Sequence, residues 1–425
     1  MSRKITIDTL FTFTGMILFQ IVNFFVAVFI SRFSGVDSLG AYQFFIVTTT
    51  FFGFFAKMGI DEKLTYNLPY LGGVKNKKSK ILIFKSFSKV LWMSLFSAFG
   101  TILFYKIMSL YSETKIDIYD SFFSLAYLPL FSLGILIGAI FRSENFIKKR
   151  VLLIYLVPTI VTGLLLFFFI YVMKLNKNTI LAMRTISYAL MFLLGCKWLF
   201  DSFKINLISL FKYFSLKTLI KTDSTIYKWL GVAMITFLLE SGTIGLWLMR
   251  LLSDEYNVGV ISILLRLTGL TYLAPTAMGI VFGPLIAKKN ANNEEFTVLK
   301  TKMLLFSILL VSFVSLFVYF FSNQILELFG KAIGSYSTEL IYLLFGTSAI
   351  AITQPLQSMA LAINGLKKVF AISLIAGVFS LIVFLSFEVD KSVLQAVKAI
   401  SASMLVYGSF RFLYLLKSIK TNNIN

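Results

Sequence analysis

Charged side chains interrupt an otherwise apolar stretch between Tyr227 and Lys289: Glu240, Arg250 and Arg266. A charge at the centre of a bilayer costs about 2.5–3.5 kcal/mol on insertion scales, so each of these needs a counter-ion, water or a ligand. A carboxylate among guanidinium groups can form an ion pair, carry a proton or help to bind an anion. These three residues are therefore the first candidates for chemistry in the chain.

Two other residue types that support much protein chemistry are scarce. The chain has no histidine, which excludes histidine-ligated metals, Ser-His and Cys-His nucleophile pairs and histidine proton relays. The single cysteine, Cys196, excludes an intrachain disulfide and any cysteine-rich metal cluster. We expect no catalytic residues, no metal and no cofactor; that the protein is not an enzyme is expected from its two-lobe architecture, described below.

Glu240 and Arg266 fall at nearly the same depth if they lie on two neighbouring spans. Glu240 would lie about 17 Å from the cytoplasmic end of its helix and Arg266 about 14 Å from the outer end of the next. In a hydrocarbon layer of about 30 Å these levels nearly coincide. This predicts either a structural Glu240–Arg266 ion pair, or an Arg266 that binds an anionic substrate while Glu240 tunes it or carries a coupling proton.

Other polar side chains are weaker candidates for a substrate cavity. Arg250 and Arg32 fall at the outer ends of equivalent helices and Arg184 near the outer end of another, where extension to the interface is the alternative role. Lys197 and Arg411, at inner helix ends, are given no functional role. Polar pairs that could contact sugar hydroxyls, or merely join helices by hydrogen bonds, are Gln20 with Asn23 and Gln354 with Gln357.

The composition defines the fold class. Of 425 residues, 58% are hydrophobic and 14% are charged, and the apolar residues form runs long enough to cross a membrane. We expect an all-α polytopic membrane protein with twelve spans at 10–31, 39–60, 82–107, 121–141, 151–173, 179–200, 229–252, 257–287, 303–323, 339–363, 370–387 and 393–416. The net charge of +21 is then typical of loops that face the cytoplasm and anionic lipid, and nucleic-acid binding is not expected.

Basic residues concentrate in the loops that follow even-numbered spans, which places both termini in the cytoplasm. The longest polar connection is basic and amphipathic, which suits a helix lying on the inner leaflet. It divides the chain into an N-terminal six-helix lobe (1–200), a linker (201–228) and a C-terminal six-helix lobe (229–425). Matches such as Gly40 with Gly259 and Pro129 with Pro355 indicate parallel repeats, which predict a central cavity and alternating access.

Short motifs spread over the whole length carry a resemblance to a known family. They are Gly40-Ala41-Tyr42, the Lys57–Ile60 end of the second span, Pro284-Leu-Ile286 and the Asn364–Lys368 turn. With twelve spans in two lobes, the chain resembles the polysaccharide (O-antigen type) lipid-linked oligosaccharide flippases of the multidrug/oligosaccharidyl-lipid/polysaccharide exporter superfamily. The resemblance implies inner-to-outer-leaflet transfer of an undecaprenyl-pyrophosphate-linked oligosaccharide for O-antigen, lipopolysaccharide or capsule-type polysaccharide biosynthesis.

The resemblance also implies a setting: a bacterial inner membrane, a cationic cavity, H⁺ or Na⁺ as coupling ion, contacts with membrane lipids, and a polymerase and glycosyltransferases of the same pathway as partners. Two alternatives stay open. A multidrug/cation antiporter of the same superfamily would favour an acidic cavity. A membrane-embedded polysaccharide polymerase or glycosyltransferase would normally carry a large outer loop or a catalytic carboxylate pair, and Asp117 with Asp120 is the sole outer acidic pair.

Overall fold

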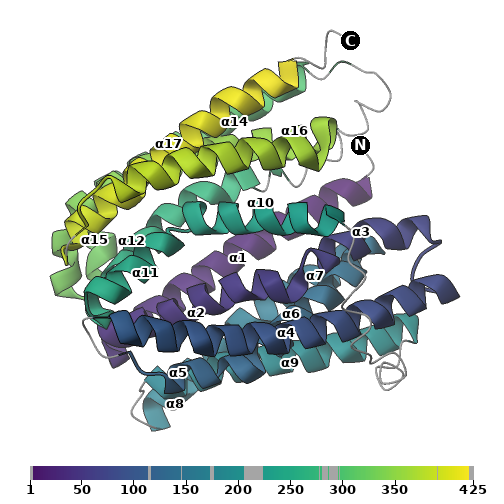
Figure 1. The fold of residues 1–425 in the computed structure, drawn as a ribbon, viewed down its shortest axis with the longest axis horizontal. Coiled ribbons are helices and arrows are strands. Elements are labelled where there is room, and N and C mark those ends of the chain that lie inside the picture. Colours follow the sequence, from purple (N-terminus) through teal and green to yellow (C-terminus); the bar gives the residue numbers. More distant parts are fainter. Residues whose placement is uncertain are drawn as a thin grey trace. The chain divides into compact units, whose positions relative to one another are not determined.

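The computed structural model describes residues 3–112, 116–144, 146–172, 177–204, 224–276, 278–279, 286, 295, 297–389 and 391–420. Nearly all of the described backbone is helical (Figure 1). Among the described residues, eleven helices are long and apolar enough to cross a membrane, and a bent pair of shorter helices brings the number to twelve. The expected all-α polytopic fold is confirmed, and the chain is a multi-pass membrane protein.

Two compact units divide the chain: residues 1–34 with 41–230, here called unit 1, and residues 35–40 with 231–425, here called unit 2. The helices of unit 1 are α1 (Arg3–Ser34), α2 (Val36–Lys57), α3 (Ile60–Tyr70), α4 (Lys77–Tyr111), α5 (Tyr119–Phe122), α6 (Ser124–Ser143), α7 (Ile147–Val151), a π-helical turn η1 (Leu152–Leu156), α8 (Val157–Val172) and α9 (Lys177–Phe203). The first residues of α2 belong to unit 2 by their contacts.

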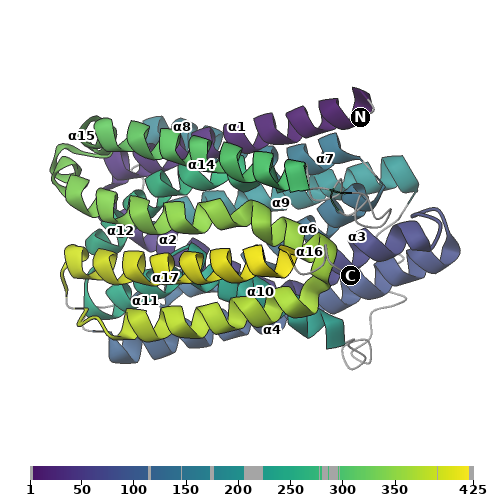
Figure 2. The ribbon, with the colours of Figure 1, turned by 90° about the horizontal axis from the view of Figure 1, so that it is seen from above.

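The remaining described helices belong to unit 2, except that residues 224–230 of α10 belong to unit 1: α10 (Ser224–Glu240), α11 (Thr243–Leu252), α12 (Glu255–Thr268), the 3-10 turn η4 (Gly269–Tyr272), α14 (Thr297–Phe320), α15 (Ser322–Glu327), the 3-10 turn η5 (Lys331–Tyr336), α16 (Ser337–Leu385) and α17 (Val393–Lys420). The helical backbone of α16 is continuous but carries two candidate spans, Lys331–Leu361 and Lys367–Leu385, and it turns back on itself between them with α17 packed alongside (Figure 2).

Most expected spans coincide with helices, and the differences have local causes. The seventh span is broken, with α10 and α11 inclined at 57° across the break. The turn expected at Asn364–Lys368 is helical backbone inside α16. The end of the long eighth span and most of the linker, at 277, 280–285 and 205–223, lie outside the described residues, so the domain boundaries proposed for 1–200, 201–228 and 229–425 stay a prediction.

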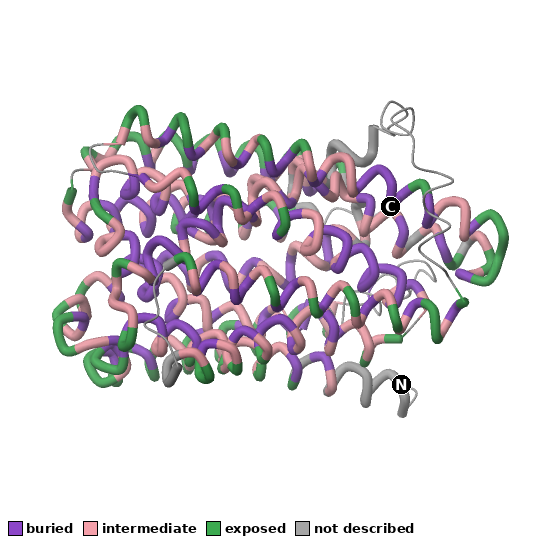
Figure 3. Tube along the Cα trace, turned by 90° about the horizontal axis from the view of Figure 1, so that it is seen from below, coloured by how far each residue is buried: buried purple, intermediate pink, exposed green. Residues whose placement is uncertain are grey.

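Burial follows a membrane pattern (Figure 3). Small polar residues such as Ser94, Thr101 and Ser307 are buried between helices, whereas Phe313 and Phe320 of α14 are 68% and 69% exposed. Apolar rings on the outside suit lipid as the solvent, and small polar residues let helices approach closely inside. In unit 2 the backbones at Gly40 and Glu255 lie so close together that a Cβ on Gly40 would lie 1.8 Å from the Glu255 carbonyl oxygen.

Candidate functional site

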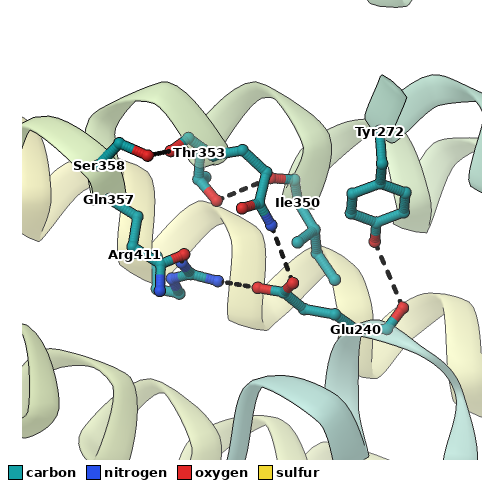
Figure 4. Close-up of polar contacts among 8 residues, drawn as sticks. Glu240, Tyr272, Ile350, Thr353, Gln357, Ser358 and Arg411 are labelled. Atoms are coloured by element: carbon teal, nitrogen blue, oxygen red, sulfur yellow. Dashed lines mark hydrogen bonds and ion pairs between the residues drawn. The ribbon is translucent and has the colours of Figure 1, made fainter. Parts of the chain in front are cut away.

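An ion pair between Glu240 and Arg411 forms the centre of a polar cluster in unit 2 (Figure 4). Glu240 is the last residue of α10, and Arg411 lies on α17, far away in the sequence. The Arg411 side chain has no exposed surface, and Nη1 donates to Glu240 Oε1. Because both groups are charged, the hydrogen bond that joins them belongs to the strong class.

Two glutamines of α16 extend this pair at either end. Gln354 Nε2 donates to Glu240 Oε2 over 2.8 Å, and Arg411 Nη2 donates to Gln357 Oε1. The two glutamines are three residues apart, so they project from one face of α16, beside Pro355. The result is a chain of polar groups, Gln354–Glu240–Arg411–Gln357, that joins three helices.

The cluster is placed at the break in the seventh span. Two residues after Glu240, Gly242 adopts φ +66°, a left-handed conformation that glycine adopts without steric cost. The break frees carbonyl groups at the end of α10, and Tyr272 of η4 donates its hydroxyl to the Glu240 main-chain oxygen over 3.4 Å. Both neighbouring spans are therefore irregular beside the ion pair, and side chains satisfy the backbone there.

A tyrosine one helical turn away covers the guanidinium. The Tyr407 ring centroid lies 4.9 Å from the Arg411 guanidinium carbon, at cation–π distance. A buried ion pair gains little stability overall, but loss of one partner costs about 3–5 kcal/mol because the other charge remains buried. Glu240 and Arg411 are thus strongly coupled, and the cluster as a whole carries no net charge.

The expected Glu240–Arg266 ion pair is wrong: the carboxylate of Glu240 bonds to Arg411 and Gln354. Arg266 lies near the end of α12 and is half-buried. Depth along the two helices gives a similar level for the two residues. Depth does not say in which direction either side chain points, and the break after Glu240 changes that direction.

Sequence reasoning misses Arg411 because it places this residue at the inner end of the last span. The helix continues to Lys420, which puts Arg411 nine residues, or about 14 Å, inside it. The depth argument that selects Glu240 would therefore select Arg411 as well. The available signal is an arginine inside an apolar helix, one turn after Tyr407.

The remaining arginines of the outer helix ends differ from one another. Arg250 is 2% exposed, and its Nη2 lies 3.1 Å from Glu255 Oε1, so it joins α11 to α12 instead of reaching out to the interface. Arg32, in the last turn of α1, is exposed. Within unit 2, Arg250 thus pairs with Glu255 and Glu240 with Arg411, whereas Arg32 belongs to unit 1.

Gln20 and Asn23 are half-buried on α1 in unit 1. The Asn23 amide donates to the Phe19 carbonyl over 3.0 Å, a contact within its own helix. The two residues remain candidates for substrate contact.

Arg184 of α9 forms a second buried cluster, in unit 1. It is 6% exposed, and Nη2 donates to the Tyr188 hydroxyl over 3.2 Å while Nη1 donates to Thr162 Oγ1 of α8 over 3.4 Å. The guanidinium carbon lies 4.9 Å from the Tyr188 ring centroid, and Tyr127 of α6 packs against that ring. Arg184 therefore does not extend to the interface, and its partners are neutral.

In chemical terms the described residues offer hydrogen bonds and fixed charge. No group of three or more acidic, histidine or cysteine side chains that could hold a metal occurs among them. The chain of polar groups Gln354–Glu240–Arg411–Gln357 offers two amides and an ion pair whose charges neutralise each other. Such groups suit weak hydrogen bonds to hydroxyl groups. Arg184 presents a cation in neutral surroundings.

Comparisons with known proteins place the fold. No family profile matches the chain, and no curated protein matches it in sequence. Among solved structures, an inward-facing multidrug resistance MATE family transporter of the MOP superfamily superposes with TM-score 0.71 at 16% identity, over 95% of each chain. The lipid II flippase MurJ, in an inward closed conformation, gives 0.72 at 16% identity over 99% of this chain and 88% of its own.

A third structure, an outward-facing multidrug resistance MATE family transporter of the MOP superfamily, gives TM-score 0.62 at 16% identity over 99% of this chain and 96% of its own. These similar structures are transporters and a flippase rather than enzymes. The chain thus has the fold that MATE transporters share with the MurJ flippase.

Proposed function

We propose that this protein is a flippase that moves an undecaprenyl-pyrophosphate-linked oligosaccharide from the inner to the outer leaflet of a bacterial cytoplasmic membrane by alternating access. The fold supports a transporter or flippase, because similar structures of nearly equal length include a lipid II flippase and multidrug transporters. The cargo is our inference from the charges inside the spans.

The observation that carries the choice of cargo is the neutralisation of Glu240. It is the carboxylate placed deepest in the described spans, and Arg411 and Gln354 occupy it. Four other carboxylates of those spans lie within three residues of a span end: Asp37, Asp120, Asp201 and Glu255. Glu339 lies in the first turn of α16. A carrier of organic cations needs an available carboxylate, so this distribution disfavours the multidrug antiporter.

Cationic groups are better represented. Arg184 lies among neutral partners, and Arg266 is half-buried on α12. A diphosphate crossing a hydrocarbon layer loses water, and fixed cations in a polar environment offset that loss. The amides of Gln354 and Gln357, and of Gln20 and Asn23, suit weak contacts with a sugar.

The sequence analysis expects Glu240 to carry a coupling proton, but in the structure Glu240 forms an ion pair with Arg411. A proton on Glu240 would leave Arg411 buried without its carboxylate, which is costly. We propose that Glu240 contributes to the cargo site by pairing with Arg411.

We also propose that both termini face the cytoplasm, as the basic loops indicate.

The proposal is tested in the native host. Deletion of the gene should abolish surface glycan and cause lipid-linked oligosaccharide to accumulate on the inner leaflet, and the wild-type gene should restore both. Arg266→Ala should fail to restore surface glycan while reaching the membrane at normal level, whereas Arg266→Lys should restore part of it. Normal surface glycan in the deletion strain would contradict the proposal.

Orientation is tested by cysteine labelling in a Cys196→Ser background. Lys75→Cys lies at an exposed position in the basic loop before α4, and Lys331→Cys lies at an exposed position in η5. We expect a membrane-impermeant maleimide to label Lys331→Cys in intact cells and Lys75→Cys only after lysis. The reverse pattern would overturn the proposed orientation.

A further inference from the structure

The Arg184 cluster holds a buried cation without a described counter-ion. Its two Nη atoms donate to the hydroxyl groups of Tyr188 and Thr162, and its Nε makes no hydrogen bond within the described structure. Hydroxyl groups can accept from a guanidinium, but they do not neutralise it. A buried charge in this state costs several kcal/mol, so it calls for an anion.

The surroundings are shaped by hydroxyl groups from three helices. Thr162 of α8 donates to the Pro158 carbonyl and lies 2.9 Å from the Ser187 hydroxyl of α9, so both of these are fixed. The helices that pack against α9 each carry another buried hydroxyl that makes no hydrogen bond within the described structure, Ser132 on α6 and Thr159 on α8. Thr159 lies one turn from Thr162 on α8.

The free part of the guanidinium favours one class of ligand. Arginine presents its N–H groups in a planar fork that matches the two oxygens of a phosphate or carboxylate. Nη2 donates to Tyr188 and Nη1 to Thr162, Tyr127 is a further hydrogen-bond partner of Arg184, and Nε makes no hydrogen bond within the described structure. The Tyr188 ring beneath the guanidinium holds its plane. The fork is therefore fixed before any ligand arrives.

We propose that Arg184 anchors an oxyanion-binding site inside unit 1, which takes one phosphate-type group between α6, α8 and α9. Arg184 lies seven residues, or about 10 Å, from the Lys177 end of its helix. The proposal concerns unit 1 alone, and it rests on the proposed function in that Arg184 is one of the cations offered there to a diphosphate. The oxyanion comes either from free phosphate or from the head group of a prenyl pyrophosphate.

The test measures binding with purified protein in lipid nanodiscs. Melting temperature is followed against inorganic pyrophosphate, with sodium chloride added to keep the ionic strength constant. Wild-type protein should be stabilised in a saturable manner, and Arg184→Gln should weaken the apparent affinity at least about tenfold, since a hydrogen bond to a charged group contributes about 1.5–3 kcal/mol. Equal stabilisation of the two proteins would overturn the proposal.

A second pair of variants guards against a folding defect. Thr162→Asp places an internal carboxylate beside Nη1, whereas Thr162→Asn has nearly the same size and no charge. We expect Thr162→Asp to fold, with a melting temperature at least equal to that of Thr162→Asn, and to lose the pyrophosphate response. Thr162→Asn should keep most of that response. A full response in Thr162→Asp would contradict an oxyanion site at Arg184.

The source of the oxyanion is resolved by repeating the titration with farnesyl pyrophosphate. An Arg184-dependent response at lower concentration than inorganic pyrophosphate assigns the site to a lipid-linked head group. An Arg184-dependent response at equal concentration assigns it to the free anion. Responses to both probes that are the same in Arg184→Gln as in wild type would remove the site, and Arg184 with it as a cargo contact, whereas the transport function is tested separately by the surface glycan of the deletion strain.

Discussion

Each unit buries an arginine beside a tyrosine on one of its spanning helices, α9 in unit 1 and α17 in unit 2, and the charge of the arginine has different partners in the two units. In unit 1, Arg184 precedes Tyr188 by one turn on α9, and in unit 2, Arg411 follows Tyr407 by one turn on α17. Tyr188 and Tyr407 are 219 positions apart, close to the spacing of the repeat matches in the sequence. Both guanidinium carbons lie 4.9 Å from their ring centroids.

The difference lies in the counter-ion. Arg411 has the carboxylate of Glu240, whereas Arg184 has the hydroxyl groups of Tyr188 and Thr162. The same arginine–tyrosine pairing thus belongs to a neutral ion-pair cluster that joins helices in unit 2. In unit 1 it leaves a positive charge that no described carboxylate neutralises. The comparison teaches that an arginine in a membrane helix says little by itself, and that its partners decide between a structural and a binding role.

The largest effect should follow from the loss of the carboxylate in unit 2. Glu240→Gln leaves Arg411 buried without a counter-ion, and we expect a loss of about 3–5 kcal/mol in stability. The double variant Glu240→Gln with Arg411→Gln should recover most of it, because neither charge remains. Thermal unfolding of the detergent-solubilised protein measures both, and a single variant as stable as wild type would break the comparison.

The next effect concerns the helix break that positions Glu240. Gly242 has φ +66°, and a Cβ there would lie 2.8 Å from Leu265 Cδ1, so Gly242→Ala should cost about 1–2 kcal/mol from the left-handed backbone alone. Gly269→Ala is the matched control, because a Cβ at that position meets nothing within 4 Å. If the two variants melt at the same temperature, the break is not a fixed feature of unit 2.

A smaller loss is expected at the tyrosine that satisfies the end of α10. Tyr272→Phe removes the hydroxyl that donates to the Glu240 carbonyl oxygen, and a single neutral hydrogen bond contributes about 0.5–1.5 kcal/mol. The effect should vanish in a Gly242→Ala background if the break is lost there. Additive losses would show that Tyr272 acts independently of the break.

The smallest loss of stability should follow in unit 1. Arg184→Gln removes a buried charge that no described carboxylate neutralises, so we expect no loss of stability, because the folded protein no longer carries the cost of that charge. The same thermal unfolding assay applies. A loss as large as that of Glu240→Gln would show that Arg184 has a structural counter-ion and that the two units do not differ.

Much of the fold follows from the sequence, because runs of about twenty apolar residues are a strong signal for helices that cross a membrane. As far as the described residues reach, the twelve expected spans fall on the observed helices, apart from the break after Glu240. That break depends on one glycine in a left-handed conformation, and Gly242 in an apolar run does not differ by composition from glycines inside intact helices such as Gly195.

The site is only partly predictable. Glu240, Gln354 and Gln357 are selected because polar residues at mid-depth are costly, and the structure brings these three together. Arg411, which links them, is not selected because the last span is expected to end at residue 416, whereas the helix continues to Lys420. Which side chains face each other is set by helix packing and rotation, and a single sequence contains no direct signal for either.

The central claim is that this fold carries a lipid-linked anionic glycan and not an organic cation. The most direct measurement places purified protein in vesicles that hold a fluorescent undecaprenyl-pyrophosphate-linked sugar in both leaflets, and follows the fraction that an added membrane-impermeant quencher can reach. We predict that wild-type protein makes the whole labelled pool accessible, whereas protein-free vesicles expose only the outer half. Accessibility unchanged by the protein, together with ion-driven uptake of a cationic rhodamine dye, would contradict the account.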